Sequence, residues 1–249
     1  MPNDPYLDAS VAWRIRTGNL EFREADFRTT SQNIIESGMA TEVKGLISTG
    51  KEADVYLAGY NDAPIAVKMY RLYRTSHRGG RPIKLDSAGR LAAHEFDMLY
   101  QAWKGGALVP TPAKRVENML SMRYLGNELG TAPRLVDAEL DDPETFMISV
   151  IQGIESLAKA GVVHSDLSPY NILVFEGRPW FIDLSEAIRV DRLGYSHWQR
   201  LDEAKKALEH GLRTIQDHFL KYGVTNRDDD FVERIISSLD RFNVRERPG

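Results

Sequence analysis

The feature that most constrains the fold of this chain is an eight-residue polar stretch, His164–Asn171 (HSDLSPYN), set between apolar segments. Two short apolar runs follow it, NILVF and PWFID, separated by a glycine-bearing turn, and the second run ends at Asp183. Two short strands joined by a tight turn predict a β-hairpin. The hairpin would return Asp183 to the edge at which Asn171 stands, so one edge would carry Asp166, Asn171 and Asp183.

These three side chains are of the types that phosphoryl transfer requires. One carboxylate must lie near the attacking oxygen, and Asp166 suits that role. An amide oxygen and a second carboxylate must hold magnesium against the phosphates, as Asn171 and Asp183 would. The alternative interpretation is a capped turn in which Asp166 and Asn171 satisfy backbone amides. His164 is expected to be a structural hydrogen-bonding residue rather than a base.

A second motif lies in the first half of the chain. Ser48–Tyr56 (STGKEADVY) reads as a turn between two strands, and Lys68 follows on the next strand (AVK). Such a loop can turn backbone N–H groups toward phosphate oxygens, while a strand lysine supplies a fixed positive charge. The order of residues is not that of a Walker A loop. Taken alone, a Gly-Lys turn is usually only a turn and a strand lysine usually faces water.

A lysine in that position needs a carboxylate partner to orient it, and Glu95 is the residue we expect to serve. It lies in a helical stripe that contains Leu91, Phe96, Leu99 and Trp103. A solvated glutamate is the alternative, because Asp97 lies nearby and Asp86 occupies the preceding loop.

The rest of the pattern predicts an α+β fold. Three short β runs (VKGLIS, ADVYLA and PIAVKMY) form a meander, followed by a basic loop that extends to Arg90, a helix that stops at Gly105-Gly106, and a further strand in NMLSMRYL. Asp142-Pro143-Glu144 marks the start of a helix that ends at Gly161. Two more helices are expected after residue 200. We expect residues 1–40 to be an accessory helical segment.

Composition narrows the class of protein. The 249 residues are 42% hydrophobic and 27% charged, with a formal net charge of -4, which is typical of a globular protein and argues against wholesale coating of nucleic acid. Without cysteine there is no disulfide, thiolate chemistry or cysteine-based metal site. The six histidines show no paired spacing for zinc. With neither a secretion signal nor a membrane-spanning run, we expect a cytoplasmic protein without membrane contact.

The motifs STGKEADVY, AVK, HSDLSPYN and WFIDLSEAI together resemble the RIO protein kinases, and most closely the first RIO subfamily. The resemblance extends from about Gly38 to Tyr222. It implies a bilobal, reduced kinase fold with a small antiparallel N-lobe sheet, one helix of the αC type, a mainly helical C-lobe and no activation segment. Residues 1–40 would be accessory, 41–125 the N-lobe and hinge, and 126–249 the C-lobe.

The same resemblance implies the roles of individual residues and the cofactors, ATP with Mg²⁺ or Mn²⁺. Lys68 and Glu95 match the lysine–glutamate pair, and Asp166 matches the catalytic aspartate. Asn171 and Asp183 match the metal ligands. The remaining matches are the phosphate loop and the hinge that receives adenine: Ser48, Gly50, Lys51 and Glu52 for the loop, and Met122, Arg123 and Leu125 for the hinge.

Two positions depart from the family pattern. Pro169 stands where many relatives have glutamate, which makes the loop more like that of ordinary kinases. Leu184-Ser185 follows Asp183 in place of the D-x-G that we expect in close relatives. The turn therefore lacks glycine's freedom at positive φ, which bears on its local geometry rather than on the ligand.

By resemblance, the expected function is that of an ATP-dependent serine/threonine kinase, also an ATPase, in maturation of the small ribosomal subunit. Its partners would be the precursor particle or its proteins. The basic stretch 71–84, with Arg71, Arg74, Arg78, Arg81 and Lys84, would contact rRNA or be a solvated loop. One alternative is a small-molecule phosphotransferase of the aminoglycoside or choline kinase type. Another is an assembly factor that uses ATP as a conformational timer, with a transient phosphoaspartate.

Overall fold

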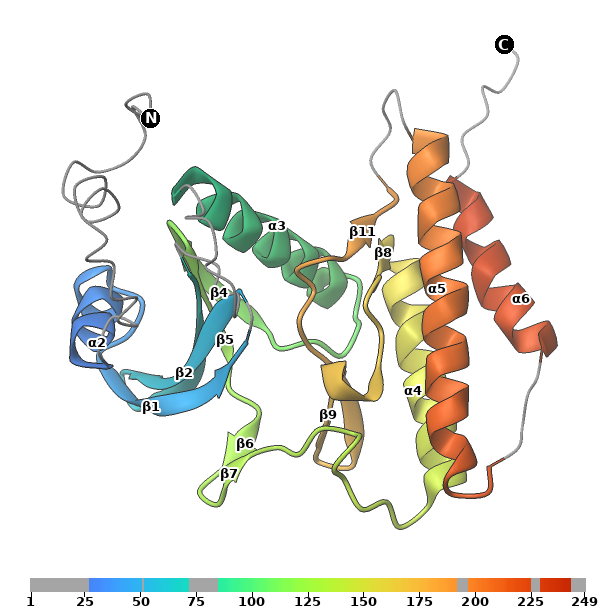
Figure 1. The fold of residues 1–249 in the computed structure, drawn as a ribbon, viewed down its shortest axis with the longest axis horizontal. Coiled ribbons are helices and arrows are strands. Elements are labelled where there is room, and N and C mark those ends of the chain that lie inside the picture. Colours follow the sequence, from blue (N-terminus) through green and yellow to red (C-terminus); the bar gives the residue numbers. More distant parts are fainter. Residues whose placement is uncertain (1–26, 51, 72–84, 192–196, 225–228, 243–249) are drawn as a thin grey trace, which may run out of the picture. The chain divides into compact units, whose positions relative to one another are not determined.

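The computed structural model describes residues 27–50, 52–71, 85–191, 197–224 and 229–242. The described residues fall into two compact units. Unit 1 comprises those within Met1–Ala93 and Ala113–Met122, and unit 2 those within His94–Pro112 and Arg123–Gly249. The expected α+β class, with an antiparallel sheet and several helices, is confirmed (Figure 1). Residues 1–26 of the expected accessory segment lie outside the described residues.

Unit 1 is built on a five-stranded sheet in the order β1-β2-β3-β5-β4. The three expected strands of the meander are present, and each pairs antiparallel with the next in sequence. The strand β4 was not predicted, because PAKRV places two cations between short apolar ends. The strands are β1 (Glu42–Thr49), β2 (Ala53–Tyr60), β3 (Ala63–Tyr70), β4 (Pro112–Val116) and β5 (Met119–Arg123).

The core of unit 1 joins this sheet to helix α2 (Phe27–Glu36). Ile34 of α2 is fully buried, whereas its neighbour Ile35 is exposed, as expected where only one face of a helix meets a sheet. The cluster also includes Tyr56 and Val67, which are paired across β2 and β3.

Helix α3 runs from Leu85 to Lys104, so the expectation of a loop as far as Arg90 is wrong. The reason is that the first buried residues described in this helix, Ala88 and Ala92, are small and give no large apolar signal. At the other end Trp103 is 44% exposed, although the pattern assigned it to the buried stripe. The helix stops before Gly105-Gly106, as expected.

Unit 2 contains α4 (Pro143–Lys159), whose start and end follow the predicted signals. The Asp142 carboxylate accepts hydrogen bonds from the Thr145 N–H (3.0 Å) and the Thr145 hydroxyl (2.7 Å), which satisfies free donors of the first turn. Gly161 has φ +77° and continues the chain beyond the C-cap, Ala160.

Helix α4 packs against the hairpin of β9 (Ile172–Phe175) and β10 (Arg178–Phe181) and beside α5 (His197–Leu220) and α6 (Asp229–Ser238) (Figure 1). All six apolar residues predicted for the inner face of α5 are buried: Leu201, Ala204, Leu208, Leu212, Ile215 and Phe219. Short elements complete the unit: β6 (Gly126–Asn127), β7 (Gly130–Thr131), β8 (Val162–Val163), η1 (Pro169–Asn171), β11 (Ile188–Arg189) and η2 (Leu239–Phe242).

Within the described ranges, no helix combines the length and the apolar character needed to cross a bilayer.

The contact between α4 and β10 leads to a stability prediction. A Cβ added at Gly153 would stand 2.4 Å from a ring carbon of Phe181, so Gly153→Ala should lower the free energy of unfolding by about 1–3 kcal/mol. Gly89→Ala in α3 is the matched control, because its Cβ would meet the Glu117 carbonyl at an ordinary 3.5 Å. The control should raise stability by about 0.5–1 kcal/mol. Urea unfolding measures both, and equal signs for the two would contradict this packing.

Candidate active site

The predicted catalytic loop leaves β8 at Val163 and begins with a buried histidine. His164 Nε2 donates to the Ile182 carbonyl at 2.9 Å, which fixes the loop against the end of β10. Nδ1 is then the unprotonated nitrogen, and it has no hydrogen-bond partner among the described residues. Burial lowers the pKa of His164, while the bond to Ile182 and the charges of Asp183, Asp166 and Glu95 oppose that shift. His164 therefore serves as a neutral structural group in this geometry.

Two exposed aspartates stand beside buried leucines. Asp166 and Asp183 are exposed, whereas Leu167 and Leu184, which directly follow them, are buried. Each leucine anchors the backbone in the core, so each carboxylate is held at the surface in a fixed place. Helix α5 permits this at Leu167 because the helix has glycine at the contact: a Cβ on Gly211 would stand 2.8 Å from the Leu167 Cβ.

Pro169 is the first residue of η1, a short 3₁₀ turn whose last residue is Asn171. Its ring presets φ near the value that the first position of such a turn requires. The departure from the family pattern at this position therefore supports the loop. Asn171 Nδ2 donates to the Asp166 carbonyl (2.7 Å) and to Asp166 Oδ2 (3.3 Å), so the structure brings Asn171 and Asp166 together.

Asp183 reaches the same end of the hairpin because the Ile182 N–H donates to the Asn171 carbonyl at 3.0 Å. The positive φ of this turn falls on Asp183 itself (+61°), and Ser185 is not among the residues with positive φ. In this turn the residue at position 185 therefore does not need glycine's freedom at positive φ. Aspartate tolerates this region better than most residues. The Ser185 hydroxyl adds a hydrogen bond of 2.8 Å to Asp183 Oδ1.

The segment after Asp183 is held by contacts that the sequence reasoning missed. The Ser165 hydroxyl donates to the Glu186 carbonyl at 2.5 Å, and His94 Nε2 of α3 donates to the Ala187 carbonyl at 2.9 Å. Beyond them, β11 pairs with β8. These bonds join side chains to backbone carbonyls over separations of 21 and 93 residues, and no local sequence signal marks them.

The first half of the predicted site lies in unit 1. Gly50 donates its N–H to the Ala53 carbonyl (2.8 Å), and a Cβ on Gly50 would approach that same oxygen to 3.1 Å, so the turn favours glycine. Ser48 lies in β1, and Glu52 accepts from the Arg71 N–H through its carbonyl (2.8 Å). Lys51 lies outside the described residues.

Arg71 closes the base of this loop. Its guanidinium makes a bidentate contact with the Asp54 carboxylate, with Nε 2.9 Å from Oδ2. The side chains are only 13% and 16% exposed, so the pair joins the start of β2 to the end of β3. Arg71 was predicted as part of an RNA-facing stretch, but its guanidinium is engaged by Asp54. The remaining residues of that stretch, 72–84, lie outside the described residues.

Lys68 lies on β3 in unit 1 and is 8% exposed, unlike an ordinary solvated strand lysine. In unit 2, Glu95 is 1% exposed, whereas Asp97, the alternative carboxylate on the same helix, is exposed. Burial therefore favours Glu95 over Asp97 as a functional carboxylate. The side chain of Asp86, the other alternative carboxylate, lies outside the part of the chain that the structure describes. The pairing of Lys68 with Glu95 joins residues of different units and stays a prediction.

The predicted hinge begins at Met122, a buried residue of β5 in unit 1, and continues in unit 2. The Arg123 N–H donates to the Thr111 carbonyl (2.9 Å), and the Leu125 carbonyl accepts from the Ala132 N–H (3.0 Å). Both bonds fix the backbone of the segment.

The donor set of the loop and hairpin fits magnesium. Because Asn171 Nδ2 is used by Asp166, its remaining polar atom is the acceptor Oδ1, and Asp183 is exposed. Mg²⁺ is usually held by one or two carboxylates plus substrate phosphates rather than by an all-protein cage. The described residues contain no group of three or more His, Cys, Asp or Glu side chains that could hold a metal ion.

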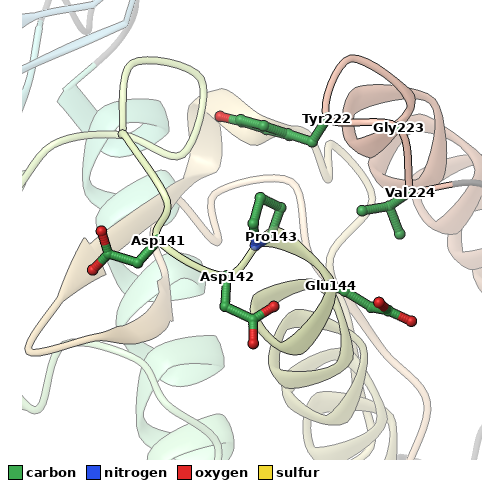
Figure 2. Close-up of a pocket in the computed structure, with 7 residues that line it drawn as sticks. All are labelled: Asp141, Asp142, Pro143, Glu144, Tyr222, Gly223 and Val224. Atoms are coloured by element: carbon green, nitrogen blue, oxygen red, sulfur yellow. The ribbon is translucent and has the colours of Figure 1, made fainter.

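A pocket of about 560 Å³ lies elsewhere in unit 2 and contains none of the predicted site residues. Figure 2 shows Pro143 and Glu144, at the start of α4, across from Tyr222 and Val224. Its lining carries the carboxylates of Asp141, Asp142 and Glu144, which would repel the phosphates of a nucleotide. We therefore do not place the nucleotide there.

The fold and the loop–hairpin arrangement define a protein-kinase-like protein, and comparison with known proteins gives the family. A family model described as the RIO domain matches residues 54–231. This chain belongs to the RIO family.

Relatives with similar sequences are named as kinases. The RIO-type serine/threonine-protein kinase Rio1 of Haloferax volcanii is 29% identical over 214 residues, covering 80% of this chain and 71% of that protein. Rio1 of Thermoplasma acidophilum is 33% identical over 126 residues, or 51% of this chain and 61% of that protein. Serine/threonine-protein kinase RIO1 of Caenorhabditis elegans is 29% identical over 189 residues, covering 68% of this chain but 37% of that protein.

Solved structures show the same fold at lower identity. The Rio2 kinase of Chaetomium thermophilum matches with a TM-score of 0.65 at 18% identity, covering 92% of this chain and 76% of that one. The same kinase in an ADP/Mg²⁺-phosphoaspartate complex matches with a TM-score of 0.63 at 17% identity, covering 94% and 80%. The expected kinase-like fold is confirmed.

The buried state of His164 predicts a pH dependence of stability. Because burial lowers its pKa below the ordinary value of 6.5, the unfolded chain gains a proton first as the pH falls. The contribution of neutral His164 to the free energy of unfolding is present above pH 6.5. It is lost as the pH falls toward the lower pKa of the folded state, at up to about 1.4 kcal/mol per pH unit.

His164→Gln keeps an N–H donor for Ile182 but does not titrate. Urea unfolding between about pH 7.5 and 5 should give the variant lower stability at neutral pH and a shallower decline than the wild type. Parallel declines would show that folding does not lower the pKa of His164.

Proposed function

We propose that the chain is an ATP-dependent serine/threonine kinase of the RIO type. The observation that carries the proposal is the meeting of Asp166, Asn171 and the hairpin end with Asp183 at one place in unit 2. The names of the relatives from Haloferax and Caenorhabditis support the activity. Family membership disfavours the aminoglycoside or choline kinase alternative. A cytoplasmic location stays part of this proposal.

In this proposal each residue has one role. Asp166 positions the acceptor hydroxyl, and Asn171 and Asp183 supply the oxygens that hold Mg²⁺, which neutralises phosphate charge when bound. Mn²⁺ would suit the same oxygens. Lys68, oriented by Glu95, contributes positive charge to the phosphates, and Ser48, Gly50, Lys51 and Glu52 form the phosphate loop.

Adenine would be received by the hinge, Met122 to Leu125. Because the Arg123 N–H and the Leu125 carbonyl are used by Thr111 and Ala132, we assign adenine to the Arg123 carbonyl and the Leu125 N–H. One acceptor and one donor, two residues apart, suit the amino edge of adenine.

The role of Asp166 is tested by Asp166→Asn, which keeps the shape and removes the charge. MgATP affinity should stay within about twofold of the wild type, while phosphoryl transfer to a protein acceptor should fall about 100- to 10,000-fold. Calorimetry and radiolabel transfer measure the two quantities. Glu176→Gln, in the exposed hairpin turn, is the matched control and should change neither. A loss in turnover of less than about tenfold would rule out the positioning role.

A second candidate is an ATPase that acts as a timer in assembly of the small ribosomal subunit, with precursor particles and rRNA as partners. The observation that favours it is the exposed Asp183 carboxylate, held by Ser185. The complex of the Chaetomium Rio2 kinase, named above, also includes a phosphoaspartate. In this reaction a carboxylate oxygen of Asp183 bonds to the γ-phosphorus, the bond to the β–γ bridging oxygen breaks, and ADP leaves. Water then hydrolyses the acyl phosphate.

The two candidates differ in the product that accumulates on the chain. During turnover of γ-labelled ATP, the timer should carry its label on Asp183, and hydroxylamine should remove that label because acyl phosphates are cleaved by this nucleophile. Label that survives hydroxylamine and maps to serine would reject the timer and leave the kinase standing. Asp183→Asn is the control and should carry no acyl label.

A further inference from the structure

The segment Arg123–Leu125 is anchored on the β9–β10 hairpin within unit 2. Leu125 is buried in a cluster with Leu173 of β9 and Trp180 of β10, two residues that are paired across the hairpin. The segment is therefore fixed on one side by apolar packing against both strands.

Arg123 adds a second anchor through its guanidinium. The carbon Cζ lies 5.6 Å from the ring centroid of Phe175 and 5.2 Å from that of Trp180. The two rings meet edge to face, with centroids 6.3 Å apart. A planar guanidinium is well suited to such stacking, and cation–π attraction is effective within about 6 Å of a ring centroid. The Arg123 guanidinium thus contacts one aromatic ring of each strand, Phe175 of β9 and Trp180 of β10.

The opposite end of this hairpin carries the metal-holding residues. β9 begins directly after Asn171, β10 ends two residues before Asp183, and four residue pairs join the strands between them. A tight turn, with Glu176 and Gly177 at positive φ, closes the other end. The hairpin is therefore a short spacer with Arg123 held near its turn and the metal-holding residues at its open end.

We propose that Arg123 is a positioning residue that sets the spacing between the adenine-binding backbone and the metal-holding end of the hairpin. The inference rests on the proposed function, because it assumes that one nucleotide engages both places. A ligand that links two subsites binds tightly only when their spacing is fixed to match it, because the second contact then becomes intramolecular. If the Arg123–Leu125 segment is loosened, the affinity for a nucleotide that engages both places falls. The affinity for either half of that nucleotide alone does not change.

The test compares MgATP with its two halves, adenosine and magnesium tripolyphosphate, by calorimetry and competition. Arg123→Met keeps the length of the side chain and removes its charge. It should weaken MgATP binding about 3- to 30-fold, the range of one or two cation–π contacts. Adenosine and magnesium tripolyphosphate should change by less than about twofold. Arg123→Lys keeps the charge and should recover part of the loss.

Two further variants sharpen the result. Arg178→Met removes an exposed arginine from the same hairpin and should change MgATP affinity by less than about twofold. Phe175→Leu removes one ring, so its effect should be smaller than that of Arg123→Met, and the two together should not add. These effects should occur without a large shift in the thermal midpoint.

Several results would overturn the inference. Unchanged MgATP affinity in Arg123→Met would show that the anchor is not needed. An equal loss for adenosine would make Arg123 a local part of the adenine site, and additive effects of Arg123→Met and Phe175→Leu would exclude the stacked contact. A wild type that fails to bind MgATP would reject the proposed function itself, a distinct outcome from a wild type that binds it and an unaffected variant.

Discussion

The hydrogen bond from the Ile182 N–H to the Asn171 carbonyl, 3.0 Å long, closes the open end of the β9–β10 hairpin, and the candidate site depends on that closure. It brings together Asn171 and Asp183, which are twelve positions apart in the sequence. The surrounding chain supports it, because β9 is bonded on its other side to Pro133 and Leu135 and β10 is bonded to Leu108. Helix α4 covers the hairpin at the Gly153–Phe181 contact.

The charges of the site follow a simple rule of solvation. Ionised carboxylates are costly to bury without partners, and Asp166 and Asp183 remain exposed while their neighbouring leucines enter the core. The apolar packing of Leu167 and Leu184 therefore helps to set the positions of the two carboxylates. Ser185 and Asn171 then restrict the two side chains through hydrogen bonds from neutral donors to the carboxylates.

Much of this arrangement could be predicted from the sequence, because it depends on local signals. The alternating strands, the Asp142 cap and the apolar stripe of α5 each have a recognisable period or cap, and the hairpin is bounded by its turn. Two-residue strands such as β8 and β11 carry no period. The start of α3 was missed because alanine and glycine pack closely without a large apolar side chain. The contact of Arg123 with Trp180 joins residues far apart in the sequence and depends on tertiary packing, which no sequence window contains.

The most direct measurement of the central claim is the affinity for ATP with and without Mg²⁺ in the wild type and in Asp183→Asn. If the closed hairpin end holds the metal against the phosphates, the wild type should bind ATP more tightly with Mg²⁺ than without it. Asp183→Asn should lose most of that difference while retaining the metal-free affinity, because the change leaves the adenine-binding segment intact. Equal ATP affinity with and without Mg²⁺ in the wild type would contradict the assignment of the hairpin end as the metal-holding part of the site.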